Sequence, residues 1–252
     1  MRQTARLTVL GVVAAAMLPL GAQAGESVTY SVGGAEFEGY NAPAMGDSKG
    51  LVLIIHDWDG LTDYEEKRAE MLAEMGYDAF AIDLFGKGNR PADVDARRAE
   101  TGKLYSDREK MRSLLMGGLA AARERSAAPA VVMGYCFGGA AVLEMARSGQ
   151  AEEVAGYATF HGGLATPEGQ SYPASTPPLL IAHGGADTAI TMDEVAGLSK
   201  ELEAGGLTYQ IEVYSGAPHA FTVFDSQAYR ETADRQSWQA FEDFLASTLI
   251  GS

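Results

Sequence analysis

The hexapeptide GYCFGG at residues 134–139 constrains the folding of this 252-residue chain more than any other segment. The apolar run Ala130–Met133 precedes it and is typical of a buried strand, whereas residues 140–147 favour a helix. A strand that turns into a helix over one residue needs a tight, strained bend. Glycines two positions before and after Cys136 permit that bend, because a Cβ atom there would clash. The segment therefore predicts a strand, a sharp turn with Cys136 at its apex, and a helix.

The pattern G-x-C-x-G is that of the nucleophile elbow of α/β-hydrolases, with cysteine in place of serine. A thiol at this apex lies at the N-terminus of a helix, where unpaired N–H groups and the helix dipole favour negative charge. We therefore expect the pKa of Cys136 to lie below its usual value of about 8.5. The alternative is a buried, inert cysteine, which is the usual state of a free thiol.

The rest of the chain alternates between apolar runs and helix-forming stretches. The run Leu51–Ile55 is continuous, as is typical of a parallel strand that is buried on both faces. Residues 26–40 alternate around Gly33-Gly34, which predicts an antiparallel hairpin at the edge of the sheet. Further strands are expected at residues 78–82, 154–160, 178–182 and 208–214.

Helix signals separate these strands. The capping box at Thr62 opens one helix, and Gly76 closes it. Residues 91–125 predict two helices, with interruptions near Thr101-Gly102 and Gly117-Gly118. Further helices are expected at residues 192–202, with Gly205-Gly206 as the stop, and after a cap at Asp225. This alternation of strands and helices predicts one α/β domain, residues 25–252, with the α/β-hydrolase fold. Such a fold has a mostly parallel sheet with helices on both faces, and here we expect an N-terminal antiparallel hairpin as well.

Two polar residues after later strands can complete the chemistry of the elbow. In α/β-hydrolases the nucleophile is followed along the chain by an acid and then by a histidine. Asp187 and His219 each follow a predicted strand, so both are expected at the sheet edge that carries Cys136. There His219 would take the thiol proton, and Asp187 would fix the imidazole tautomer. Each residue alone would usually be structural, but the order and placement of all three favour a triad.

The loop after the first buried strand is expected to complete the site. An oxyanion hole needs two N–H donors, and we assign these to the backbone amides of Trp58 and Phe137. The carboxylate of Asp57 stands beside this hole and would hold the thiol protonated until substrate arrives. An equal alternative is that Asp57 caps the segment at Thr62 or faces solvent. His161 ends the strand after the elbow helix and is expected to line the pocket.

The remaining histidines and glycine pairs suggest no cofactor. His56 is expected to be buried at a strand end, and His183 to support the loop that delivers Asp187. No two histidines have the spacing of metal ligands, and Gly33-Gly34 and Gly184-Gly185 lack the strand–turn–helix context of a phosphate-binding loop. We therefore expect hydrolysis without a metal ion or cofactor.

The N-terminus predicts a secretory signal peptide at residues 1–24. Arg2 and Arg6 form a positive region, residues 7–20 are apolar, and Ala22-Gln23-Ala24 is a small-x-small cleavage site, which places Gly25 at the mature N-terminus. The alternative is a membrane anchor, but the apolar run is short for a spanning helix. Cleavage removes two arginines and no acid, so the formal net charge changes from −15 to −17.

The net charge and the single cysteine limit the binding partners and the cellular compartment that we expect for this protein. Such acidity argues against nucleic acid or an anionic membrane as a partner. A single cysteine excludes an internal disulfide, so an exported form of this chain depends on its core alone. We expect an exported protein, periplasmic or secreted, that leaves the membrane after cleavage and acts on a small molecule as a monomer.

The sequence resembles the dienelactone hydrolase family of α/β-hydrolases over nearly the whole mature chain. The motifs that carry the resemblance are Phe37-Glu38-Gly39-Tyr40, His56-Asp57-Trp58-Asp59-Gly60, Asp83-Leu84-Phe85-Gly86, residues 134–139, His161-Gly162-Gly163, Gly184-Gly185-Ala186-Asp187 and Pro218-His219-Ala220-Phe221. The resemblance implies a Cys136–His219–Asp187 triad that hydrolyses an ester or lactone through an acyl-thiol intermediate. It also implies that Lys87 and Phe221 line the substrate pocket.

The sequence departs from the well-known lactone-cleaving members of that family at three positions. Those members have a glutamate beside the oxyanion hole, where this chain has the shorter Asp57. They bind the substrate carboxylate with two arginines, where this chain has Lys87 and Val223. Lysine offers a point charge without the bidentate fork of arginine, and valine offers no charge. The resemblance therefore implies a small ester or lactone as the substrate, and the departures argue against dienelactone itself.

Three other functions compete with ester hydrolysis. An acyl-transfer or thioester-directed enzyme would use the same triad and look identical in sequence. An exported binding protein that keeps the fold without turnover would explain the substituted anion-binding positions, but it would have no need of the three triad residues. A thiol redox role lacks a resolving cysteine, because Cys136 is the single cysteine of the chain.

Overall fold

The computed structural model describes residues 25–251, so the expected signal peptide lies outside the described residues. Within that range the chain forms one eight-stranded sheet in the order β1-β2-β4-β3-β5-β6-β7-β8. The strands are β1 (Glu26–Val32), β2 (Ala35–Ala42), β3 (Leu51–Ile55), β4 (Asp78–Ile82), β5 (Ala130–Tyr135), β6 (Val154–Phe160), β7 (Leu179–Gly184) and β8 (Tyr209–Tyr214). The pairs β1–β2 and β2–β4 are antiparallel and the others are parallel, which confirms the predicted sheet and hairpin.

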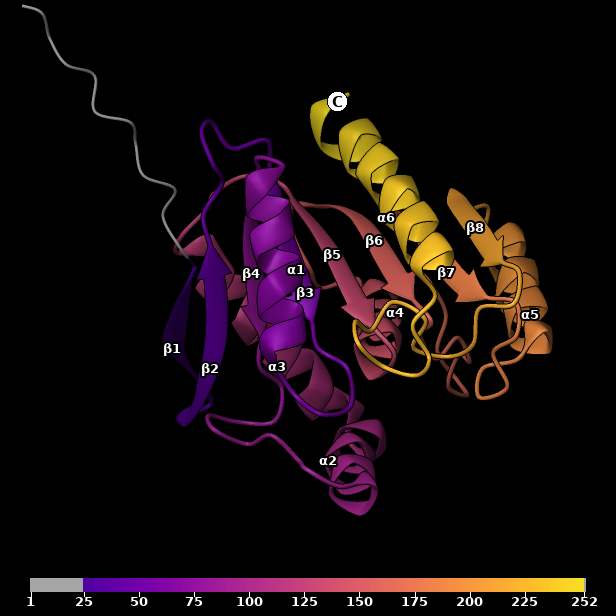
Figure 1. Cartoon of the computed structure of the whole chain (residues 1–252), viewed down its shortest axis with the longest axis horizontal. Helices are drawn as coiled ribbons and strands as arrows, with labels where there is room; N and C mark the ends of the chain where they lie inside the picture. The colour runs from indigo at the N-terminus through magenta and orange to yellow at the C-terminus, as the bar shows by residue number, and fades with distance from the viewer. Residues whose placement is uncertain (1–24, 252) are drawn as a thin grey trace, which may run out of the picture.

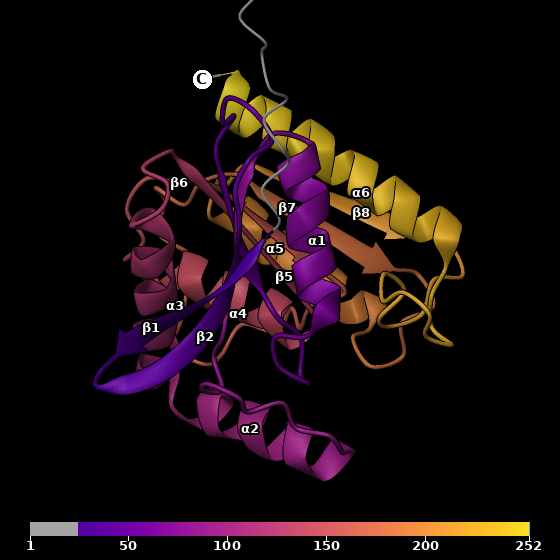
Figure 2. The ribbon, with the colours of Figure 1, turned by 60° about the vertical axis from the view of Figure 1, so that its left-hand side comes forward.

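Helices cover both faces of the sheet, as Figure 1 shows. They are α1 (Asp63–Glu74), α2 (Val94–Ser106), α3 (Arg108–Arg123), α4 (Phe137–Ser148), α5 (Met192–Ala204), α6 (Glu231–Leu245) and a π-helical turn, η1 (Ala246–Ile250). Helices α1 and α6 lie on one face, and α3, α4 and α5 lie on the other (Figure 1). Helix α2 stands apart, beyond the carboxyl ends of the parallel strands, in both Figure 1 and Figure 2.

Strand β3 shows why both faces need a cover. Every residue of this strand is buried, and successive side chains enter opposite hydrophobic cores. Leu53 and Ile55 belong to the core beneath α3, α4 and α5, whereas Val52 and Ile54 belong to the core beneath α1 and α6. This follows from the two-residue period of a strand. A continuous apolar run therefore requires a layer of helices on each side.

The break between α2 and α3 lies at Asp107, not at either glycine site named from the sequence. The Asp107 side chain accepts from the backbone N–H of Lys110 at 2.9 Å and caps α3. Gly117 and Gly118 lie inside α3, where a Cβ would stand 2.3 Å from Val32 and 2.7 Å from Ile82 respectively. These glycines therefore allow α3 to approach the sheet closely and do not end a helix.

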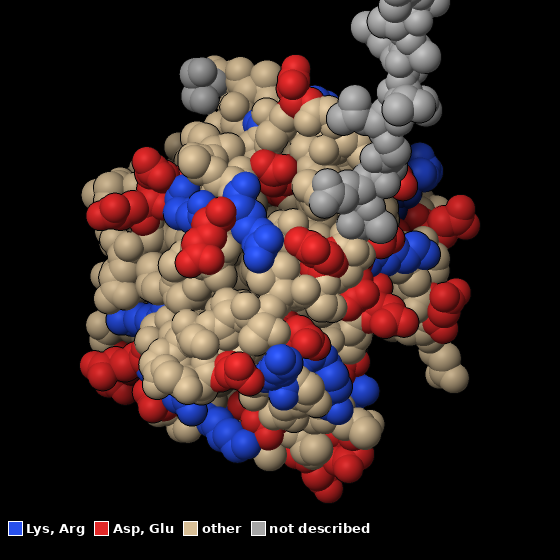
Figure 3. Space-filling view, turned by 90° about the vertical axis from the view of Figure 1, so that its left-hand side faces the viewer, with Lys and Arg blue, Asp and Glu red and all other residues tan. Residues whose placement is uncertain are grey.

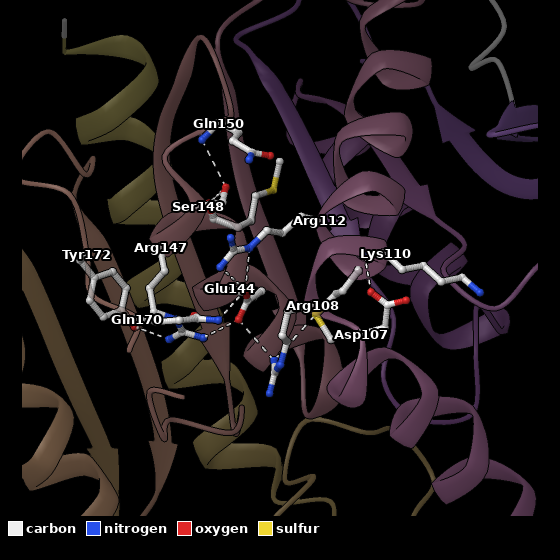
Figure 4. A network of polar contacts seen from close by, with 12 residues as sticks. Asp107, Arg108, Lys110, Arg112, Glu144, Arg147, Ser148, Gln150, Gln170 and Tyr172 are labelled. Atoms are coloured by element: carbon white, nitrogen blue, oxygen red, sulfur yellow. Dashed lines mark hydrogen bonds and ion pairs between the residues drawn. The ribbon is translucent and has the colours of Figure 1, made fainter. Parts of the chain in front are cut away.

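A buried charge cluster ties α3 to α4 (Figure 4). Glu144 of α4 has no exposed surface, and its carboxylate accepts from Arg112 at 2.7 Å and from Arg108 and Arg147 at 3.3 Å each. Arg147 also donates to the hydroxyl of Tyr172 at 2.9 Å. A buried carboxylate is stable only when it is paired and hydrogen bonded, so the cluster holds α3 against α4.

The final helix begins later than the sequence suggests. Helix α6 starts at Glu231, and its N-cap residue Arg230 makes no side-chain cap. Asp225 lies in the preceding loop with a φ of 58° and does not cap the helix. The loop between β8 and α6 is consequently long, and it carries His219.

Charges of both signs are interspersed on the face shown in Figure 3, without a large patch of one sign. Within residues 25–251, no helix combines the length and the apolar character that crossing a membrane requires.

Candidate active site

Cys136 occupies the bend between β5 and α4 with a φ of 50° and a ψ of −111°. Positive φ is strained for a residue that carries a Cβ, and the neighbouring glycines explain how the bend closes. A Cβ on Gly134 would lie 2.4 Å from the carbonyl oxygen of Gly138, and one on Gly138 would lie 2.2 Å from that of Ile55. The sharp strand–turn–helix predicted around Cys136 is therefore present.

Three side chains from separate loops meet at this bend. Nε2 of His219 lies 3.1 Å from Sγ of Cys136, and Nδ1 lies 2.8 Å from Oδ2 of Asp187. Asp187 follows β7, and His219 follows β8. A carboxylate can only accept, so the Nδ1 of the neutral ring carries the hydrogen and Nε2 is free to accept one from the thiol. This is the geometry of a nucleophile, a base and an orienting acid.

Hydrogen bonds fix the Asp187 carboxylate. Its Oδ1 accepts from the backbone N–H groups of Ala189 and Ile190 at 2.8 and 2.9 Å. Burial acts to raise the pKa of Asp187, but the hydrogen bond from His219 and these N–H groups outweigh it and hold that pKa below its usual value. The carboxylate is therefore ionised at neutral pH and oriented toward His219.

The thiol does not have the lowered pKa expected from its place at a helix N-terminus. Burial, followed by the negative charge of Asp57, raises the pKa of Cys136 to about 12. The backbone N–H of Phe137 acts in the expected direction, but it is the smaller effect. Desolvation of a buried thiolate outweighs the helix N-terminus here. The resting site therefore holds a neutral thiol beside His219.

The loop that follows β3 approaches the bend at Cys136. A Cβ on Gly138 would also lie 2.5 Å from the carbonyl oxygen of His56, so the start of α4 touches the start of this loop. Trp58 lies two residues further along, and Phe137 is the first residue of α4. The two amides assigned to an oxyanion hole therefore come from backbone segments that are in contact.

Asp57 is buried next to the site, at 7% exposure. Its Oδ1 accepts from the backbone N–H of Asp59 at 3.1 Å, and its own N–H donates to Glu65 at 3.4 Å. Its side chain neither caps the segment at Thr62 nor faces solvent. Burial, together with Asp59 and Glu65, raises the pKa of Asp57 well above its usual value. In its ionised form Asp57 disfavours the Cys136 thiolate, and this effect adds to the larger effect of burial.

Three residues expected in the pocket lie elsewhere. His161 and Phe221 have no exposed surface, and their rings pack behind His219, with centroids 5.3 Å apart for His161–His219 and 5.5 Å for His161–Phe221. His161 packs directly against His219, and Phe221 packs against His161, so both rings lie in the core. The side chain of Lys87 turns to the N-terminal hairpin, where Nζ donates to the hydroxyl of Thr29 at 3.0 Å.

The burial expected of His56 is confirmed, and His183 is also fully buried. Nε2 of His56 accepts from the backbone N–H of Leu84 at 3.1 Å, and Nδ1 lies 2.6 Å from the carbonyl oxygen of Asp57. Among residues 25–251, no three His, Cys, Asp or Glu side chains are grouped so that they could hold a metal ion.

Sequence reasoning missed Tyr105, which comes from α2. Its ring centroid lies 5.4 Å from that of Phe137, and partial burial, followed by the nearby Cys136 in its thiolate form, raises the pKa of Tyr105 to about 12. Helix α2 is mostly polar, so an aromatic residue near its end was the available signal. Sequence alone could not show that α2 reaches the edge of the sheet.

Solved structures resemble this fold closely. A dienelactone hydrolase-like promiscuous phosphotriesterase from metagenomic libraries has a TM-score of 0.82 at 25% identity, with 90% of this chain and 99% of that chain covered. A putative dienelactone hydrolase from Klebsiella pneumoniae has a TM-score of 0.75 at 21% identity, with coverage of 88% and 98%, and shares the fold.

Curated relatives and a family model agree with these structures. The probable 2-oxo-3-(5-oxofuran-2-ylidene)propanoate lactonase of a Bradyrhizobium species is 27% identical over 218 residues, which cover 79% of this chain and 84% of that protein. The carboxymethylenebutenolidase of Rhodococcus opacus is 27% identical over 222 residues, covering 80% and 82%. The model of the dienelactone hydrolase family matches residues 37–249. This chain is accordingly a hydrolase that belongs to the dienelactone hydrolase family.

Proposed function

We propose that this protein hydrolyses a small carboxylic ester or lactone with Cys136 as the nucleophile, His219 as the base and Asp187 as the orienting acid. The observation that carries the proposal is the continuous hydrogen-bonded line from Asp187 through His219 to the sulfur, with separations of 2.8 and 3.1 Å. A structural cysteine would have no need of a base held at this distance by a buried carboxylate.

In the first half-reaction, Nε2 of His219 takes the thiol proton and the sulfur attacks the carbonyl carbon of the substrate. A carbon–sulfur bond forms, and the carbonyl electron pair moves to oxygen, where the N–H groups of Trp58 and Phe137 stabilise the oxyanion. Collapse of this intermediate breaks the carbon–oxygen bond, and the imidazolium protonates the leaving alkoxide. The product is an acyl-thiol enzyme; with a lactone, the new hydroxyl stays attached to the acyl group.

In the second half-reaction, neutral His219 takes a proton from water. The resulting hydroxide attacks the acyl-thiol, and the sulfur leaves and recovers its proton from the imidazolium. Asp187 stabilises the imidazolium in both halves without taking the proton itself. The cycle returns a neutral thiol, which is the state favoured by burial and by Asp57.

Asp57 adds to the protonation of this thiol in the free enzyme. Burial is the main cause that keeps the sulfur protonated until a substrate lies next to it, and the ionised form of Asp57 acts in the same direction. When a neutral substrate has displaced water from the site, the thiol would transfer its proton to His219 and the sulfur would attack the substrate in close succession. We therefore propose that Asp57 limits unproductive reactions of the thiol.

The test is a burst assay on p-nitrophenyl esters of short acids and on small lactones. The wild-type protein should give a stoichiometric burst followed by steady turnover, whereas Cys136→Ala should give neither. Asp187→Asn should lower kcat by about 10³- to 10⁴-fold, because the imidazole loses the correct tautomer. Asp193→Asn, in the first turn of α5, is the matched control and should behave as wild type.

Each outcome separates the competing functions. Turnover that survives Cys136→Ala contradicts the proposed nucleophile. A protein that binds esters without hydrolysing any of them supports the exported binding protein considered from the sequence. Faster transfer of the acyl group to an added thiol or alcohol than to water supports an acyltransferase.

We further propose that the mature protein is exported and acts as a monomer in the periplasm or outside the cell. The sequence of residues 1–24 supports export, since it combines a positive start, an apolar run and a small-x-small site. N-terminal sequencing of the secreted or periplasmic fraction should begin at Gly25. An intact Met1 in the membrane fraction would contradict cleavage.

A further inference from the structure

The loop that carries His219 is held by a buried polar network that the triad does not include. Thr222 is three residues beyond His219 and is 1% exposed. Its hydroxyl lies 2.7 Å from the hydroxyl of Tyr64 and 2.8 Å from Nε2 of His161, and its carbonyl oxygen accepts from Nη2 of Arg68 at 2.9 Å. The side-chain hydroxyl and the backbone carbonyl of Thr222 therefore both have hydrogen-bond partners.

Arg68 is the centre of this network and is 1% exposed. Its guanidinium forms a buried ion pair with Asp234 of α6. The guanidinium carbon lies 4.2 Å from the ring centroid of Phe224 and 4.8 Å from that of Trp238. A buried charge with one anionic partner and aromatic faces around it is fixed in place. Arg68 thus holds the loop through Thr222 and Phe224.

A chain of hydrogen bonds leads from Arg68 to the ring behind His219. Nε of Arg68 donates to the hydroxyl oxygen of Tyr64 at 3.4 Å, and the hydroxyl groups of Tyr64 and Thr222 are hydrogen bonded to each other. The Thr222 hydroxyl is also hydrogen bonded to Nε2 of His161. The ring of His161 meets that of His219 edge to face, with centroids 5.3 Å apart. The network therefore fixes the surface on which His219 packs.

Helix α1 connects this network to the opposite side of the site. Tyr64 and Arg68 lie on α1, and so does Glu65, whose carboxylate accepts from the backbone N–H of Asp57 at 3.4 Å and of Thr62 at 2.9 Å. One rigid helix thus contacts both the loop that carries Trp58 and the loop that carries His219. The His219 loop needs such support, because Ala220 has a φ of 61°.

We propose that Tyr64, Arg68 and Thr222 are positioning residues that hold Nε2 of His219 within hydrogen-bond distance of the Cys136 thiol. We also propose that α1 fixes the position of the His219 loop relative to the Trp58 loop. This inference rests on the proposed function. It predicts that loss of the Thr222 hydroxyl reduces catalysis while substrate binding and folding persist. A purely structural network would reduce stability alone.

The test compares Thr222→Val, which removes the hydroxyl and keeps the shape, with Thr222→Ser, which keeps the hydroxyl. Thr222→Val should lower kcat by about 10- to 100-fold with KM within about twofold, because small displacements of a catalytic group cost this much. Thr222→Ser should restore most of kcat. Arg68→Lys should resemble Thr222→Val, because lysine lacks the second nitrogen with which arginine reaches Tyr64 through Nε while Nη2 contacts Thr222 and Asp234.

The matched control is Arg147→Lys. Arg147 is also a buried arginine, with a side chain 2% exposed against 1% for Arg68, and it pairs with the buried Glu144 on the far side of the sheet. This variant should be destabilised to a similar extent in chemical denaturation and keep kcat. Equal losses of kcat in Arg147→Lys and Thr222→Val would overturn the proposal.

A spectroscopic measurement tests positioning without turnover. The Nδ1 hydrogen of His219, bonded to Asp187, should give a downfield proton resonance that is identified by its loss in Asp187→Asn. It should broaden or shift in Thr222→Val and persist in Thr222→Ser and Arg147→Lys. An unchanged resonance and an unchanged kcat in a folded Thr222→Val would overturn the inference. If the wild type hydrolyses no ester, the proposed function fails, and the resonance alone decides whether Thr222 positions His219.

Discussion

The raised pKa of Cys136 leads to a quantitative prediction for the reactivity of the free enzyme. A thiol with a pKa of 9.0 is ionised to about 10% at pH 8, whereas a pKa of about 12 leaves about 0.01% as thiolate. The difference is about 10³-fold, or about 4 kcal/mol. We therefore expect iodoacetamide to alkylate the native protein up to about 10³-fold more slowly at pH 8 than the same chain unfolded in guanidinium, because the higher nucleophilicity of a high-pKa thiolate offsets part of its low population.

The assay is the second-order rate of alkylation, followed by intact mass between pH 5 and pH 10. Cys136 is the single cysteine, so the unfolded chain is its own reference. Restricted access would lower the rate without changing its pH dependence, whereas a raised pKa makes the native rate climb about tenfold per pH unit up to pH 10. Asp57→Asn should speed alkylation of the native protein, because it removes a charge that disfavours the thiolate.

One result would refute this reasoning. A native rate that matches or exceeds the unfolded rate, with a plateau between pH 5 and pH 8, would mean that Cys136 and His219 already form a thiolate–imidazolium pair. Pairing would then outweigh burial, and Asp57 would have no gating role.

Two further predictions concern stability. Gly138→Ala should destabilise the protein by more than about 3 kcal/mol in urea unfolding, because the new Cβ would lie 2.2 Å from the carbonyl oxygen of Ile55; the control Gly102→Ala, with no atom within 4 Å of its new Cβ, should be neutral or slightly stabilising. Asp187 has a lowered pKa in the folded protein, so its contribution to stability is complete above the unfolded pKa of about 4 and is lost as the pH falls through the folded value. Urea midpoints measured from pH 6 to pH 3 should therefore fall less for Asp187→Asn than for the wild type, and parallel curves would contradict the assignment.

The elements that could be read from the sequence are those with strong local signals. The apolar run Leu51–Ile55, the capping box at Thr62 and the glycines around Cys136 each specify a backbone state within a few residues. The break between α2 and α3 was misplaced, because a glycine inside a helix looks the same in sequence whether it ends the helix or lets the sheet approach. Gly117 and Gly118 do the latter, against residues distant in sequence.

The order of Cys136, Asp187 and His219 along the chain, each after a strand, was sufficient to place all three at one edge of the sheet, since parallel strands end on the same side. Sequence alone could not set the pKa of the thiol, because desolvation depends on everything packed around it and here exceeds the local effect of the helix N-terminus. Nor could it show that Arg68 reaches Thr222, 154 residues away. Local chemistry thus determined which residues are available for catalysis, and only tertiary packing decided their charge state and what holds them in place.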